Sequence, residues 1–199
     1  MEEKDLEQAK RRDRKVDITD IAIEKVPFIE YKGFTETQNR IIHELSKEVL
    51  RLSQKNNNCN EVAITCALDY REKDNFVYSV AYGDEHSVNV LADTESYHLI
   101  KGIENVTVIM MHNHPSTQTF SFRDLIFFLE YDKIKMMIVV SNQGTLHYLM
   151  REDNFNKSAL INLYKQYVSK ITDESDAKQC YNAVLGILHN CSSAGVLYR

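Results

Sequence analysis

The sequence of 199 residues contains no tryptophan, only two prolines and only six glycines. This scarcity argues against collagen-like, proline-rich and glycine-rich linker architectures. No apolar run approaches the roughly 20 residues that cross a bilayer, so a membrane-spanning helical protein is excluded. The first thirty residues also lack the apolar stretch of a secretory signal peptide, and the expected location is therefore the cytoplasm.

The four cysteines are widely spread and form no C-x-x-C pair. A disulfide scaffold is therefore excluded, and reduced, partly buried thiols are expected. The P-C-x-x-C part of the zinc deaminase signature is absent as well. The cysteines are Cys59, Cys66, Cys180 and Cys191.

Charge is balanced slightly toward acid, with 24 Lys and Arg against 29 Asp and Glu and a net charge of −5. This balance gives no general attraction to nucleic acid. Charged residues are concentrated between positions 2 and 17, where acidic residues flank and interrupt a basic cluster at 10–15. We therefore expect residues 1–33 to form a charged, partly disordered arm, and a solvated tail is favoured over a nucleic-acid contact.

Hydrophobic periodicity predicts a mixed α/β domain over residues 34–152. Thr35 and Gln38 resemble a capping box at the start of a helix that reaches about Lys55. Alternation from Glu61 onward predicts a half-buried strand, and the apolar run 76–82 predicts its hairpin partner.

The second half of the chain alternates between apolar runs and helical patterns. A nearly continuous apolar run at 106–111 is typical of a central strand that is buried on both faces. Two closing helices form an expected C-terminal helical extension, residues 153–199, that packs on the same domain. The other predicted elements are strands at 87–91, 134–140 and 146–150, a turn at 141–144, and helices at 94–100, 121–131, 155–172 and 175–190.

The central strand runs directly into His112-Asn113-His114-Pro115. Alternate residues of an extended chain point the same way, so His112 and His114 can face one point. Pro115 ends the strand, and Asp124 lies one turn into the next helix. Two imidazoles and one carboxylate with an open fourth position are the ligands of a catalytic zinc.

Each part of this pattern also has an ordinary structural interpretation. An isolated H-x-H is often a pair of surface histidines, and Ser121-x-x-Asp124 also fits the N-cap and third position of a helix. Their combination after a buried strand favours a metal site.

This segment, with H-x-H-P followed by Ser-x-x-Asp, resembles the JAMM (MPN-type) zinc metalloproteases, and its residue pattern is most similar to that of the bacterial RadC-like JAB domains. The resemblance covers roughly residues 35–150 and implies a JAB/MPN-like (cytidine-deaminase-like) mixed α/β sheet flanked by helices. It further implies Zn2+ bound by His112, His114 and Asp124. Glu61 matches the family's general base, and Ser121 matches the serine that positions or stabilises the tetrahedral intermediate.

Two features depart from the family pattern. Five residues separate Pro115 from Ser121, one fewer than usual, and Ile64 replaces a small residue after the glutamate. Glu48 and Glu95 remain alternatives to Glu61 as the base. His86, His98 and His147 are weaker candidates for a substrate groove or for orienting the ligands, whereas His43 and His189 are expected to be surface or core residues.

The expected function is a zinc-dependent hydrolase that cleaves a peptide or isopeptide amide bond. Two alternatives stay open: a catalytically silent metal-binding module, and a RadC-like nucleic-acid-associated protein. The sequence identifies neither the peptide or protein substrate nor the oligomeric state.

Overall fold

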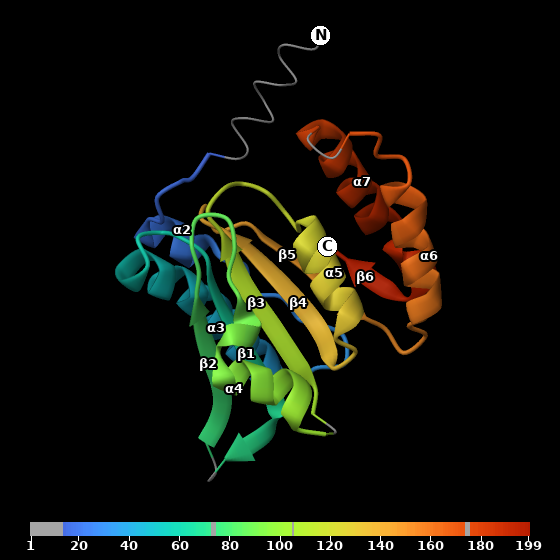
Figure 1. Cartoon of the computed structure of the whole chain (residues 1–199). Coiled ribbons are helices and arrows are strands. Elements are labelled where there is room, and N and C mark those ends of the chain that lie inside the picture. Colours follow the sequence, from blue (N-terminus) through green and yellow to red (C-terminus); the bar gives the residue numbers. More distant parts are fainter. Residues whose placement is uncertain (1–13, 73–74, 105, 174–175) are drawn as a thin grey trace.

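The computed structural model describes residues 14–72, 75–104, 106–173 and 176–199 (Figure 1). Six strands form one mixed sheet in the order β2-β1-β3-β4-β5-β6. β3 and β4 are parallel, and every other neighbouring pair is antiparallel. The strands are β1 (Val62–Glu72), β2 (Asn75–Tyr82), β3 (Val108–His114), β4 (Ile134–Ser141), β5 (Leu146–Arg151) and β6 (Val196–Tyr198).

Helices cover both faces of the sheet, so the predicted mixed α/β class is confirmed (Figure 1). α2 and α3 pack on one face, and α5, α6 and α7 pack on the other. Within the described ranges, no helix combines the length and the apolar character needed to cross a bilayer. The helices are α2 (Asp20–Lys25), α3 (Glu36–Asn56), α4 (Thr94–Tyr97), α5 (Phe122–Glu130), α6 (Lys157–Val168) and α7 (Ala177–Asn190), with shorter turns at Val90–Ala92, His98–Gly102 and Cys191–Ala194.

The predicted capping box starts α3. The Thr35 hydroxyl accepts the Gln38 N–H at 3.3 Å, and the Gln38 side-chain oxygen accepts the Thr35 N–H at 2.8 Å. These bonds satisfy two of the N–H groups that a helix start leaves free. Ile42, Val49 and Leu50 on the inner face are fully buried against the sheet.

Two expectations about the strands are wrong. β1 is buried on both faces rather than half-buried, because Ala63, Thr65 and Ala67 are also fully covered. Residues 87–89 form no strand, and a single 3₁₀ turn begins at Val90. The predicted hairpin of β1 and β2 is confirmed, although residues 73–74 at its tip lie outside the described residues.

Residues 1–13 of the predicted N-terminal arm lie outside the described residues. The rest of that segment packs on the protein, where Ile18 and Tyr31 are buried in the core on the α3 side. Val16 donates its N–H to the Pro115 carbonyl at 2.8 Å. Lys15, from the basic cluster, donates to the Asn60 side chain at 2.6 Å. The segment therefore lies beside the end of β3.

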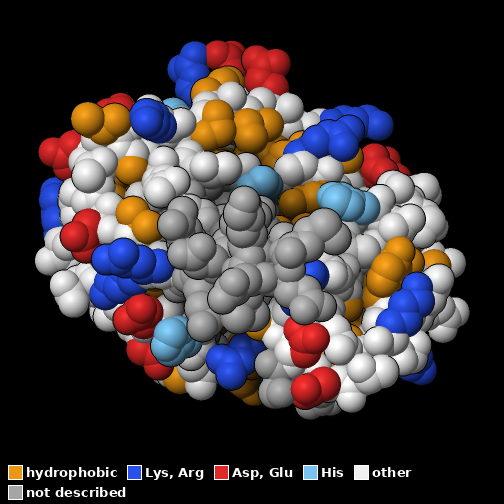
Figure 2. All heavy atoms as spheres, turned by 90° about the horizontal axis from the view of Figure 1, so that it is seen from above, with side chains coloured by type: hydrophobic (Ala, Val, Ile, Leu, Met, Phe, Trp, Pro, Cys, Tyr) orange, Lys and Arg blue, Asp and Glu red, His pale blue; other side chains and the backbone are white. Residues whose placement is uncertain are grey.

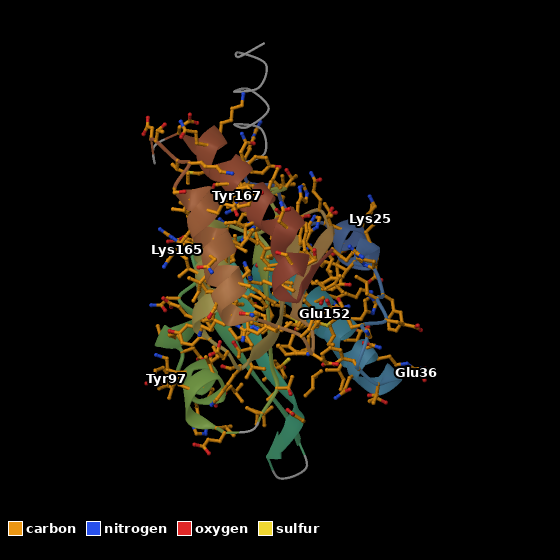
Figure 3. All side chains as sticks on the ribbon, turned by 90° about the vertical axis from the view of Figure 1, so that its right-hand side faces the viewer. Lys25, Glu36, Tyr97, Glu152, Lys165 and Tyr167 are labelled. Atoms are coloured by element: carbon orange, nitrogen blue, oxygen red, sulfur yellow. The ribbon has the colours of Figure 1, made fainter. Side chains whose placement is uncertain are left out.

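The C-terminal residues join the same core as α5. One buried cluster on the α5 face of the sheet includes Leu160 and Leu163 of α6 and Ile187 and Leu188 of α7. Figure 3 shows α6 and α7 side by side. β6, which the sequence analysis missed, extends the sheet by pairing with β5, and three residues are too few to show a strand period.

Candidate metal centre

The end of β3 positions both histidines. Ala63 of β1 pairs with His112 in antiparallel register, and side chains two residues apart share one face of a strand. His112 and His114 therefore point to the α5 face of the sheet, and both are buried. Glu61 directly precedes β1. When the register of β1 and β3 is extended by two residues beyond the pair Ala63 and His112, Glu61 lies opposite His114.

Asn113 lies between the histidines and points to the opposite face, where it is fully buried. Its side-chain oxygen accepts the Val62 N–H at 2.7 Å. Its amide group donates to Asn142 at 2.8 Å, to the Asn60 carbonyl at 3.1 Å and to the Ser53 hydroxyl at 3.2 Å. This network joins β3 to β1, to the end of α3 and to the turn after β4, so it holds the strand that carries the histidines.

The start of α5 positions the carboxylate. Ser121 is the N-cap, and Asp124 Oδ2 accepts both the Ser121 N–H at 2.6 Å and the Ser121 hydroxyl at 2.7 Å. The capping interpretation of Ser121-x-x-Asp124 is thus confirmed. It does not compete with a ligand role, because the cap occupies Oδ2 and leaves Oδ1 without a cap bond.

His112, His114 and Asp124 meet at one point. The Nε2 atoms of the histidines lie 3.0 Å apart, His112 Nε2 lies 3.2 Å from Asp124 Oδ1, and His114 Nε2 lies 3.4 Å from Asp124 Oδ2. The two distances to Asp124 involve different carboxylate oxygens, and one ligand atom from each of the three residues lies within 4.8 Å of the other two. Imidazole nitrogens and carboxylate oxygens are donors that zinc binds. The donor set therefore fits a metal ion, and this buried group can hold one.

Charge interactions among the side chains of the site favour ionised Asp124. Burial opposes its ionisation, yet attraction and hydrogen bonding from the two imidazoles hold the pKa of Asp124 well below its usual range. Burial likewise opposes protonation of His114, but Asp124 and Glu61 together raise the pKa of that imidazole. For Glu61, burial is the largest influence and raises the pKa of the carboxyl, while the histidines act against it.

The outer nitrogens of the two imidazoles differ. His114 has a hydrogen bond to the backbone of Gln118. His112 Nδ1 is buried and finds no partner among the residues that the structure describes. Metal-bound histidines normally give this second N–H to a fixed acceptor, so only His114 has the usual support.

A cavity of about 370 Å³ opens onto the three candidate ligands. Glu61 and Ser121 line it, as does His86 from the loop after β2. The other candidates lie elsewhere: Glu48 pairs with Arg51 on α3, Glu95 lies in α4, and His98 and His147 do not line the cavity. The expected non-site histidines are also away from it, with His43 bonded to the Val26 carbonyl and His189 in the last turn of α7.

The sequence reasoning did not assign roles to Asn113 and Arg123. Asn113 could have been found from its position between two histidines that share one face of a buried strand. Its own side chain must then point to the opposite face. The signal for Arg123 was a cation in the first turn of a helix beside a candidate ligand. Comparison of the chain with models of protein families, with curated proteins and with solved structures gives no match.

Proposed function

We propose that this chain is a zinc-dependent hydrolase of the JAMM type, with a JAB/MPN-like fold, that cleaves a peptide or isopeptide amide bond. The observation that carries the proposal is the convergence of two imidazoles and one carboxylate, from His112, His114 and Asp124, at a cavity that Glu61 also lines. The H-x-H-P and Ser-x-x-Asp sequence motifs, which resemble those of the JAMM family, also support the proposal.

Zinc bound by these residues would supply a positive charge that polarises a carbonyl and lowers the pKa of water. The role of Glu61 is to accept a proton from the attacking water on its carboxylate and to deliver it to the nitrogen of the leaving amine. Its position beside the histidines at the cavity suits this role, and burial raises the pKa of its carboxyl.

Ser121 acts on Asp124 in this proposal. Its hydroxyl and its N–H both bond to Asp124 Oδ2, which fixes the carboxylate with Oδ1 toward His112 and Oδ2 toward His114. Its further role beside the oxygen of a tetrahedral intermediate stays a prediction from the family resemblance.

Nucleic acid is the less favoured ligand. Among the described residues that are visible in Figure 2, blue and red side chains are interspersed. Of the basic cluster at 10–15, Lys15 is already bonded to Asn60. Neither observation supplies the concentration of positive charge that phosphate contacts require.

The test combines metal analysis with cleavage of pooled fluorescence-quenched peptides and isopeptide-linked conjugates. Purified chain should hold one zinc, and His112→Ala or Asp124→Ala should lose it. Glu61→Gln should keep the zinc and lose at least a hundredfold in cleavage rate, because the proton acceptor is removed while the ligands stay.

Glu48→Gln and Glu95→Gln are matched controls, since both glutamates lie outside the cavity. They should keep the wild-type rate. If zinc-loaded wild-type chain cleaves none of the pooled substrates, the hydrolase proposal is overturned and the chain is a metal-binding module. Chain that takes up no zinc at micromolar concentrations would overturn both.

A further inference from the structure

The lining of the cavity at the metal centre includes an arginine, Arg123. Glu61, Glu85 and Asp124 contribute acidic groups, whereas Arg123 is the only lysine or arginine among the described residues that line it. Arg123 is the second residue of α5 and is exposed. In the described part of the chain, it has no hydrogen-bond or ion-pair partner.

Nothing in the local structure explains an arginine at this position. The start of a helix carries partial positive charge, so a cation there is unfavourable for the helix itself. The first turns of α2 and α3 carry Asp20 and Glu36, which are acidic as expected. Arg123 thus gives α5 no dipole stabilisation and makes no ion pair with any residue that the structure describes, so its guanidinium can bind a group that enters the cavity.

The rest of the lining shows what kind of molecule fits. Met110 lies two residues before His112 on the same face of β3, and Phe127 lies four residues after Arg123 on the same face of α5. With Val88 and Val90, they form an apolar wall next to the candidate ligands. The cavity therefore offers apolar contact and one guanidinium beside the metal centre.

We propose that Arg123 binds a carboxylate of the substrate close to the scissile amide, while a neighbouring apolar side chain contacts Met110 and Phe127. This inference rests on the proposed hydrolase function and specifies its substrate class. A guanidinium pairs with a carboxylate through two parallel hydrogen bonds, and an amide in its place loses the charge. The carboxylate is either a Glu or Asp side chain or the free C-terminus of the substrate.

The first experiment measures cleavage by zinc-loaded chain of peptides that differ only in Glu against Gln near the scissile bond, and in free against amidated C-terminus. Wild-type chain should prefer one acidic form by about tenfold in kcat/KM, a modest factor because Arg123 is exposed. Arg123→Glu should abolish this preference, and Arg123→Lys should keep part of it. The form that shows the preference identifies the source of the carboxylate.

Lys165→Glu is the matched control, because it reverses an exposed charge on α6 away from the cavity (Figure 3). It should leave the preference unchanged. Equal cleavage of the acidic and amide peptides by wild-type chain, or an unchanged preference in Arg123→Glu, would overturn the inference.

A binding measurement separates this inference from the proposed function. Fluorescence anisotropy of the same labelled peptides with zinc-loaded Glu61→Gln chain should show about tenfold weaker binding of the amide forms, and Arg123→Glu should remove the difference. Arg123-dependent binding without cleavage by wild-type chain would refute the hydrolase and keep the carboxylate site. Absence of that difference in binding would refute the carboxylate site whatever the rate of cleavage.

Discussion

Asn113→Ala tests how the structure holds the strand between the two histidines. The substitution removes the acceptor of the Val62 N–H and the donor to Asn142 Oδ1, both of which are buried. The Asn60 carbonyl is less affected because it keeps the Ser53 hydroxyl at 2.6 Å. Two buried groups therefore lose their partners.

Each buried polar group left unpaired costs about 1–3 kcal/mol, so the free energy of unfolding should fall by about 4 kcal/mol. That is a large share of the roughly 5–15 kcal/mol that stabilises a domain. Denaturant unfolding followed by far-UV circular dichroism measures it, and this probe suits a chain without tryptophan. Zinc uptake by the same variant should weaken, because β3 loses its connection to β1.

Two further variants complete the test. Gln143→Ala changes an exposed neighbour of the network and should shift stability by less than about 0.5 kcal/mol. Asn142→Ala removes the other half of the network, and the double variant with Asn113→Ala should cost less than the sum of the two. A loss below about 1 kcal/mol in Asn113→Ala would refute the reasoning.

Three other predictions follow from buried groups and a helix cap. Burial raises the pKa of Cys66 from 9.0 to about 12. The contribution of the buried neutral thiol to the free energy of unfolding is therefore fully present below pH 9 and is lost as pH rises toward 12. Relative to Cys66→Ala, wild-type stability should fall by about 2 kcal/mol between pH 8 and 10.5, and parallel curves would contradict this. Arg151→Met removes donors to the Asp132 carbonyl and to the end of α5 and should cost about 3 kcal/mol. Lys157 is partly exposed and also pairs with Asp132, and Lys157→Met should cost under about 1 kcal/mol. Thr35→Ala should cost about 1 kcal/mol in denaturant unfolding, and equal stability of Thr35→Ala and Thr35→Ser would contradict the capping role.

Much of the fold was readable from local signals. The capping residues of α3, the continuous apolar run of β3 and the turn between β4 and β5 each identify an element without knowledge of its neighbours. The errors occurred where burial depends on a partner that is distant in sequence. Ala63 and Thr65 alternate with larger apolar residues, but both are buried, so alternation no longer marks an exposed side. The turn at His98–Gly102, which is distant in sequence, packs on β1.

For the candidate site, the sequence determined which residue types stand where a strand ends and a helix begins. His112 and His114 share a face because of strand geometry, and Ser121 and Asp124 form a cap because of helix geometry. Both relations are local, so spacing alone specifies them. Tertiary structure decided the rest, since the parallel connection from β3 through α5 to β4 folds the start of α5 back toward the end of β3. It alone brings Asp124 to 3.2 Å from His112, sets Glu61 opposite His114 through the antiparallel register, and places Arg123 at the cavity.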